Sequence, residues 1–119
     1  MIKASLLTIT FLLTLTWTTF AQEKNLEFKV LTYNIYHGEK PESLGKPNLD
    51  EVANLILKLQ PEVVALQEMD SMTTRLEGIY GEKINWVAEL GKMTGYQSYF
   101  AKAMDYAEGG YGEGVLVKN

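Results

Sequence analysis

Two stretches decide the fold: V-L-T-Y-N-I-Y-H-G at residues 30–38 and P-E-V-V-A-L-Q-E-M-D at residues 61–70. Each contains an apolar run typical of a buried β-strand and then ends on polar side chains, which are Asn34 and His37 in the first and Glu68 in the second. Open α/β sheets bind ligands at the carboxyl ends of their strands. The two stretches therefore predict a phosphate or metal site at one end of a sheet.

The pattern around this pair predicts alternating strands and helices. We expect strands over residues 28–35, 63–67, 96–104 and 114–118, loops over residues 38–47 and 71–80, and a glycine-rich turn over residues 105–112. A first helix is expected between Asn48, its N-cap, and Pro61, which cannot continue a helix. Its apolar stripe is Leu49, Val52, Ala53, Ile56 and Leu59. A second helix is expected over residues 83–94, with Gly95 as its stop and with Ile84, Val87, Leu90 and Met93 facing inward. The first strand–helix–strand unit predicts a parallel pair with a right-handed crossover.

Residues 1–21 have the features of a secretory signal peptide. Lys3 gives the start a positive charge, residues 6–20 carry no charge, and the run ends on Thr19-Phe20-Ala21, with small residues at the spacing that signal peptidase favours. The alternative is a transmembrane anchor, but a span needs about 20 apolar residues. This run is shorter and rich in threonine. We therefore expect a secreted or periplasmic protein with no stable membrane anchor after cleavage.

The composition limits what the exported chain can bind. Loss of Lys3 takes the formal net charge from −4 to −5. An acidic protein does not attract polyanions unaided, so duplex DNA is disfavoured as a substrate unless a bound cation offsets the charge. The chain has no cysteine. This excludes disulfides, thiolate metal sites and a lipoprotein anchor within this sequence.

The chain resembles the N-terminal half of the endonuclease/exonuclease/phosphatase superfamily, in a secreted bacterial branch. This group includes DNase I-like nucleases, abasic-site endonucleases, inositol polyphosphate phosphatases and sphingomyelinases. The resemblance is carried by L-T-Y-N-I-Y-H-G at 31–38, V-A-L-Q-E-M-D at 64–70 and A-K-A-M-D-Y-A-E-G-G-Y-G-E-G-V-L at 101–116. It implies an α/β fold of the α+β type, a DNase I-like two-sheet β-sandwich flanked by helices. Residues 22–119 would be a partial domain of this kind.

The resemblance also implies roles for individual residues. Glu68 matches the principal metal-binding glutamate, and Asn34 matches the asparagine that helps to place the metal and the scissile phosphate. Tyr111 and Gly112 match a Tyr-Gly pair near the site. The implied metal is Mg²⁺, or Mn²⁺. The implied substrate is a phosphoester: a lipid head group, a sugar phosphate or a nucleic acid.

The chemistry of phosphoester hydrolysis agrees with a site of this kind. Mg²⁺ keeps several of its waters and is bound by one or two carboxylates, so one glutamate at a strand end suffices. The cation neutralises charge that builds on the phosphorus oxygens during attack. The alternative role for Glu68 is an exposed charge, and for Asn34 it is a bond to the loop backbone, which asparagine often makes.

Three further residues are left open. His37 either contacts the substrate phosphate or is bonded within its own loop. Arg75 has the planar fork that matches phosphate, although a solvated surface arginine is the more frequent outcome. Asp70 is expected to cap a loop. Gln67 is expected to be structural, because strand alternation points it away from Glu68.

The family's catalytic histidines and its Asp-x-Asn and Asp-His motifs belong to the second half, and the single histidine here, His37, lies in the first motif. We therefore expect residues 22–119 alone to be inactive. The alternative function is a non-catalytic half-domain that binds a metal or partner weakly. We also expect poor stability, because an apolar strand at 114–118 without partners is prone to aggregate.

Export generates the first prediction. Because the uncharged run ends at Ala21, the mature N-terminus should be Gln22. N-terminal sequencing of exported material checks this directly. A replacement of Ala21 by a bulky residue should block or shift the cleavage, whereas the same change at Leu26 should not. Recovery of exported material that still begins at Met1 would contradict the prediction.

Overall fold

A parallel strand pair with a helical crossover opens the fold. The computed structural model describes residues 26–119, so the predicted signal peptide at 1–21 lies outside the described residues. Strand β1 (Val30–Asn34) runs parallel to β4 (Val63–Ser71), and α2 (Leu49–Leu59) connects them. Their register pairs Val30 with Val63 and Asn34 with Gln67. The predicted parallel pair is confirmed, and the carboxyl ends of both strands meet at one end of the sheet.

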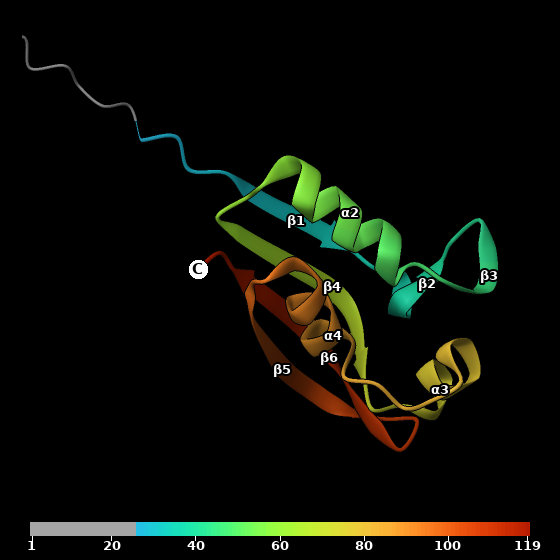
Figure 1. Ribbon diagram of the computed structural model, residues 1–119. Coiled ribbons are helices and arrows are strands. Elements are labelled where there is room, and N and C mark those ends of the chain that lie inside the picture. The colour runs from blue at the N-terminus through green and yellow to red at the C-terminus, as the bar shows by residue number, and fades with distance from the viewer. Residues whose placement is uncertain (1–25) are drawn as a thin grey trace, which may run out of the picture.

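Two antiparallel strands complete a four-stranded sheet of order β1-β4-β6-β5 (Figure 1). Strand β6 (Gly109–Val117) lies between β4 and β5 (Gln97–Tyr106) and is antiparallel to both. The predicted turn at 105–112 is present but shorter than expected: it consists of Ala107 and Glu108, with φ of 46° and 61°, and the strands take up the rest of the range. The expectation that residues 114–118 lack partners is wrong: β6 is an inner strand, and the edges of the sheet are β1 and β5.

The core lies on one face of this sheet, under α2 and α4 (Trp86–Thr94) (Figure 1). Helix α2 buries its predicted stripe through Val52, Ala53 and Ile56, but Leu59, at the last position of the helix, is 44% exposed. Helix α4 begins three residues later than predicted and buries Trp86, Val87 and Leu90, whereas Met93, predicted to face inward, is 42% exposed. The buried sheet residues that face these helices include Val64, Leu66, Met69 and Leu116. Gly95 ends α4 in the left-handed conformation, as predicted.

The two polar segments predicted as loops contain regular structure. Residues 38–47 form, with the short turn η2 (Tyr36–Gly38), a two-stranded sheet of β2 (Glu39–Lys40) and β3 (Ser43–Pro47). Residues 71–80 contain helix α3 (Thr74–Tyr80). Thr73 is its N-cap, since the hydroxyl accepts the Leu76 N–H at 3.1 Å. These elements gather at the end of the sheet where β1 stops (Figure 1).

Asn48 occupies the predicted N-cap position of α2, but its side chain does not cap the helix. Its Nδ2 donates instead to the carbonyl oxygens of Ile35 and Glu39, both at 2.9 Å. The residue therefore ties the start of α2 to the segment that follows β1.

The opposite face of the sheet is open within the described residues. Val30 on β1, Val115 on β6 and Tyr99 on β5 are 61%, 38% and 57% exposed. The predicted mixed α/β class, with a sheet flanked by helices, is confirmed. No helix among residues 26–119 has the length and apolar character to cross a membrane.

Adjacent residues of α2 generate a prediction for stability. Ile56 is 0% exposed in the core and Leu57 is 42% exposed. Ile56→Ala should lower the free energy of unfolding by about 2–5 kcal/mol, since it removes buried methyl groups and leaves a cavity. Leu57→Ala should change it by less than about 1 kcal/mol. Urea unfolding of both variants measures the difference. Equal effects would mean that α2 does not pack on the sheet through this face.

Candidate functional site

Glu68 lies at a bulge inside β4 and not at the end of the strand, which continues to Ser71. The register between β4 and β6 shifts between Leu66 and Met69, and Glu68 has a φ of 55°. A bulge inserts an extra residue and re-aims the side chains around it. The carboxylate is partly buried and makes no hydrogen bond or ion pair with another residue in the described part of the chain. It is therefore an oxygen ligand without a competing partner.

Asn34, the last residue of β1, lies beside this bulge. It pairs with Gln67, and the Ile35 N–H donates to the Gln67 carbonyl at 3.0 Å. Its Oδ1 accepts the Tyr36 N–H at 3.0 Å, so the local backbone role considered from the sequence is present. This bond fixes the amide, and Nδ2 has no partner among the described residues. Gln67 bonds to Thr32 and to the Ala65 carbonyl, as expected for a structural residue.

The turn after β1 is held in an unusual backbone conformation. Tyr36, His37 and Gly38 have φ values of 50°, 59° and 83°, all left-handed. Such a conformation costs energy in residues with a side chain and persists only when its surroundings hold it. The Tyr80 hydroxyl donates to the Gly38 carbonyl at 2.6 Å and accepts the Trp86 indole N–H at 2.8 Å. The buried end of α4 thus holds the turn in place.

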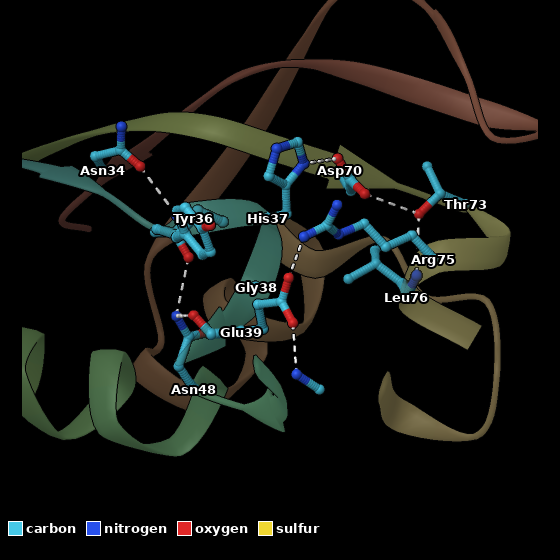
Figure 2. A network of polar contacts seen from close by, with 12 residues as sticks. Asn34, Tyr36, His37, Gly38, Glu39, Asn48, Asp70, Thr73, Arg75 and Leu76 are labelled. Carbon is cyan, nitrogen blue, oxygen red and sulfur yellow. Dashed lines mark hydrogen bonds and ion pairs between the residues drawn. The ribbon is translucent and has the colours of Figure 1, made fainter. Parts of the chain in front are cut away.

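The turn carries His37 to Asp70 on β4 (Figure 2). The distance from Nδ1 of His37 to Oδ1 of Asp70 is 2.9 Å. Asp70 is 0% exposed, and its other oxygen accepts the Thr73 hydroxyl at 3.1 Å. The predicted role of Asp70 as a loop cap is incomplete: it lies inside β4 and joins the capping residue of α3 to the histidine. No local signal reveals a contact between residues 33 positions apart.

Arg75 is paired with a carboxylate of the fold. Its guanidinium pairs with Glu39, which is buried and also accepts the Gly45 N–H at 2.6 Å (Figure 2). Burial raises the pKa of the Glu39 carboxyl, but the Gly45 N–H and the Arg75 guanidinium outweigh it and leave that pKa below its ordinary value. The pair therefore stabilises the fold at neutral pH, and its contribution is lost as the pH falls through the folded-state pKa.

Tyr111 lies on β6, directly opposite Asp70 on the neighbouring strand β4. Its ring centroid is 5.2 Å from that of His37, and Tyr106 adds a second aromatic neighbour at 6.0 Å. Burial, and then the negative charges of Glu68, Glu113 and Asp70, raise the pKa of the Tyr111 phenol. The phenol is therefore protonated at neutral pH and can donate a hydrogen bond.

The structure thus brings four of the predicted site residues to one end of the sheet and anchors the fifth, Arg75, to Glu39 beside them. The four are Asn34, His37, Glu68 and Tyr111. Residues 26–119 contain no group of three or more acidic or histidine side chains that could enclose a metal ion. The single unpaired carboxylate of Glu68 fits Mg²⁺, which needs few protein ligands and keeps its waters.

Comparison with known proteins gives a family. A model described as the endonuclease/exonuclease/phosphatase family matches residues 31–117. This range includes the whole four-stranded sheet except one residue, together with the turn that carries His37. No curated protein matches the chain.

Two solved structures share the fold. One is an endonuclease/exonuclease/phosphatase from Beutenbergia cavernae DSM 12333, with a TM-score of 0.54 and 18% identity over 76% of this chain. The other is an endonuclease/exonuclease/phosphatase family protein from Leptotrichia buccalis C-1013-b, with a TM-score of 0.55 and 18% identity over 76% of this chain. The matched region covers 25% and 37% of those two chains.

The left-handed turn generates a prediction at two glycines of similar φ. A Cβ on Gly38, with φ of 83°, would lie 2.7 Å from the Trp86 indole nitrogen, whereas one on Gly45, with φ of 78°, meets nothing within 4 Å. Gly45→Ala should cost only the backbone strain, about 1–2 kcal/mol. Gly38→Ala should cost about 3 kcal/mol or more, because it also displaces a buried ring. Thermal unfolding of both variants measures this. Equal losses would show that the turn does not pack on Trp86.

Proposed function

Because the chain belongs to the endonuclease/exonuclease/phosphatase family, we propose that it carries part of the active site of an exported, Mg²⁺-dependent phosphoesterase. The observation that carries this proposal is the carboxylate of Glu68. It is re-aimed by the bulge in β4, lacks a partner among the described residues and lies next to the strand end that bears Asn34. An unpaired carboxylate in a partly buried position is costly unless it binds a cation.

The roles of the site residues follow from their chemistry. Glu68 would hold the cation, Mg²⁺ or Mn²⁺, which when bound supplies charge neutralisation to the phosphoryl oxygens. Asn34 is fixed through Oδ1, so its Nδ2 is available to donate to a phosphoryl oxygen. Tyr111 is a neutral donor beside Glu68. The turn that follows Asn34 is held before substrate arrives, which avoids a cost of ordering upon binding.

The substrate class is a phosphoester, and three kinds remain within it: a phospholipid head group, a sugar phosphate and a nucleic acid. The formal net charge of −4, or −5 after cleavage, disfavours long polyanions. A bound metal ion and one amide donor contact only the phosphoryl group, so they do not select among the three kinds of substrate. The apolar N-terminal run supports the proposed export.

A second function is favoured by one observation. The single histidine of the sequence is bonded to a buried aspartate, and attack on phosphorus also needs an oriented and activated water. Residues 22–119 alone would then be a non-catalytic half-domain with weak Mg²⁺ binding. Translation of the reading frame beyond Asn119 discriminates the two functions. A continuation with Asp-x-Asn and Asp-His motifs supports the enzyme, and a stop codon supports the half-domain.

Glu68→Gln tests the metal site. In the protein translated from the complete reading frame, it should reduce Mg²⁺-dependent phosphoester hydrolysis by several orders of magnitude. The reason is that it removes the ligand charge and keeps the size of the side chain. The melting temperature should change little, since the carboxylate packs in no core. Hydrolysis of a panel of phosphodiesters and phosphomonoesters, with paramagnetic Mn²⁺ binding as a second readout, measures this.

Glu113→Gln is the matched control, because Glu113 is an exposed carboxylate in the middle of β6, opposite the bulge that carries Glu68. It removes one negative charge nearby without touching the proposed ligand, so turnover should stay within about twofold. Near-normal Mg²⁺-dependent turnover in Glu68→Gln, or equal losses in the two variants, would contradict the assignment of Glu68.

A further inference from the structure

We propose that Asp70 is a positioning residue that aims the imidazole of His37 at the phosphoryl group, and that Nε2 of His37 contacts a phosphoryl oxygen. This inference rests on the proposed phosphoesterase function and adds a residue and a contact to it. It starts from the position of Asp70, a fully buried carboxylate within β4, two residues after the proposed metal ligand.

Both oxygens of Asp70 are committed. Oδ1 lies 2.9 Å from Nδ1 of His37, and Oδ2 accepts the Thr73 hydroxyl at 3.1 Å. That hydroxyl itself accepts the Leu76 N–H at the start of α3. The carboxylate therefore cannot rotate without losing one of its partners. Its orientation, and with it the direction in which Nδ1 is held, is set by a helix and a strand together.

The imidazole is fixed from other directions as well. Its ring lies 5.2 Å from Tyr111 and 6.0 Å from Tyr106, measured between centroids. The backbone of His37 is left-handed, and the next residue, Gly38, is bonded to the Tyr80 hydroxyl. The His37 side chain is 21% exposed, so only a small part of the ring is open to solvent. Since Nδ1 faces Asp70, the exposed edge presents Nε2.

The exposed edge faces the proposed site. In Figure 2 the side of the ring away from Asp70 is turned toward the part of the site where Asn34 ends β1. A histidine that served only to fasten α3 would not need this edge open, because Thr73 alone caps that helix. Two successive left-handed residues with side chains, Tyr36 and His37, are a strain that is stored at functional sites more often than elsewhere.

The contact requires no covalent step. In the proposed complex Nδ1–H donates to Asp70 and Nε2–H donates to the phosphoryl oxygen. Hydrogen bonds to an anionic oxygen are stronger than those between neutral groups. The buried carboxylate sets the orientation of the ring, in the way that partner groups set the orientation of a functional histidine.

The test uses the fact that His37 is the only histidine of the sequence, so its ring resonances need no assignment. The ring ¹⁵N signals of the purified chain are followed by NMR during titration with inorganic phosphate, with and without Mg²⁺. We expect the Nε2 signal to move with saturation by phosphate, and Nδ1 to keep its proton throughout.

Asp70→Asn should weaken phosphate binding about fivefold or more, because asparagine offers one acceptor oxygen where His37 and Thr73 need two. It should also change the Nδ1 signal, because an amide replaces the carboxylate that faces this nitrogen. Tyr96→Phe is the matched control. It removes the bond to the Pro61 carbonyl, at the opposite end of the sheet, and should lower the melting temperature, but it leaves the imidazole and its aspartate in contact. Phosphate affinity should then stay within about twofold.

The outcomes separate this inference from the proposed function. Phosphate binding that needs Glu68 but leaves the Nε2 signal unmoved, or that is unchanged in Asp70→Asn, overturns the inference and leaves the metal site standing. Binding that neither Glu68→Gln nor Asp70→Asn alters overturns both. Should Asp70→Asn fail to fold, His37→Ala reads the same contact, since this side chain is partly exposed. An unchanged phosphate affinity in His37→Ala would then refute the proposal.

Discussion

The hydrogen bond from the Tyr80 hydroxyl to the Gly38 carbonyl is the interaction on which the site depends. It joins the core, through the Trp86 indole, to a turn that L-amino acids adopt only with difficulty. Without it, the left-handed residues after β1 would relax, and His37 would leave Asp70. Glycine is required at position 38 because the indole occupies the space of a side chain there. Although Gly38 lies in a turn, a side chain at this position would disturb the packing of the core.

The charges near the turn fall into two groups with different consequences. Glu39 and Arg75 compensate each other, and Asp70 is compensated by His37 and Thr73. Buried charges that are paired in this way define a geometry more than they add stability. Glu68 differs, since it has no such partner within residues 26–119. The network around it therefore acts as a rigid frame, and under the proposed function the Glu68 carboxylate is where a cation would bind.

Much of the fold follows from local patterns, but the site geometry does not. The apolar runs of β1 and β4 and the stripe of α2 were predictable because periodicity acts within one element. Helix α3 was missed because it has only seven residues and a single buried apolar side chain, Leu76, although Thr73 is a good N-cap. The β5–β6 turn was predicted, but its position was not, because alanine and glutamate take positions where asparagine and glycine are usual.

The candidate site shows the same division. Asn34, Glu68 and Tyr111 could be identified from motifs, because each lies in or beside a strand that the sequence defines. The bulge at Glu68 and the contact between His37 and Asp70 could not, since both arise when segments far apart in the chain meet. The partner of Arg75 was equally invisible: Glu39 lies 36 residues away, in a segment predicted to be a loop.

Because β6 is paired on both sides, aggregation through this strand is no longer expected. An edge strand would aggregate by adding further strands through unpaired backbone groups. Here the apolar strand is satisfied on both sides, and one actual edge, β5, carries Lys102 and Asp105, charges of the kind that blunt such pairing. What remains open is a face: Val30, Val115 and Tyr99 expose apolar surface on three strands of one sheet. Contacts across such a face involve side chains rather than backbone. They would bury apolar area against any complementary surface, including that of another copy. Charged substitutions at Val30 or Val115 would therefore act on solubility without disturbing the core or the site, because both lie on the side of the sheet away from α2 and α4.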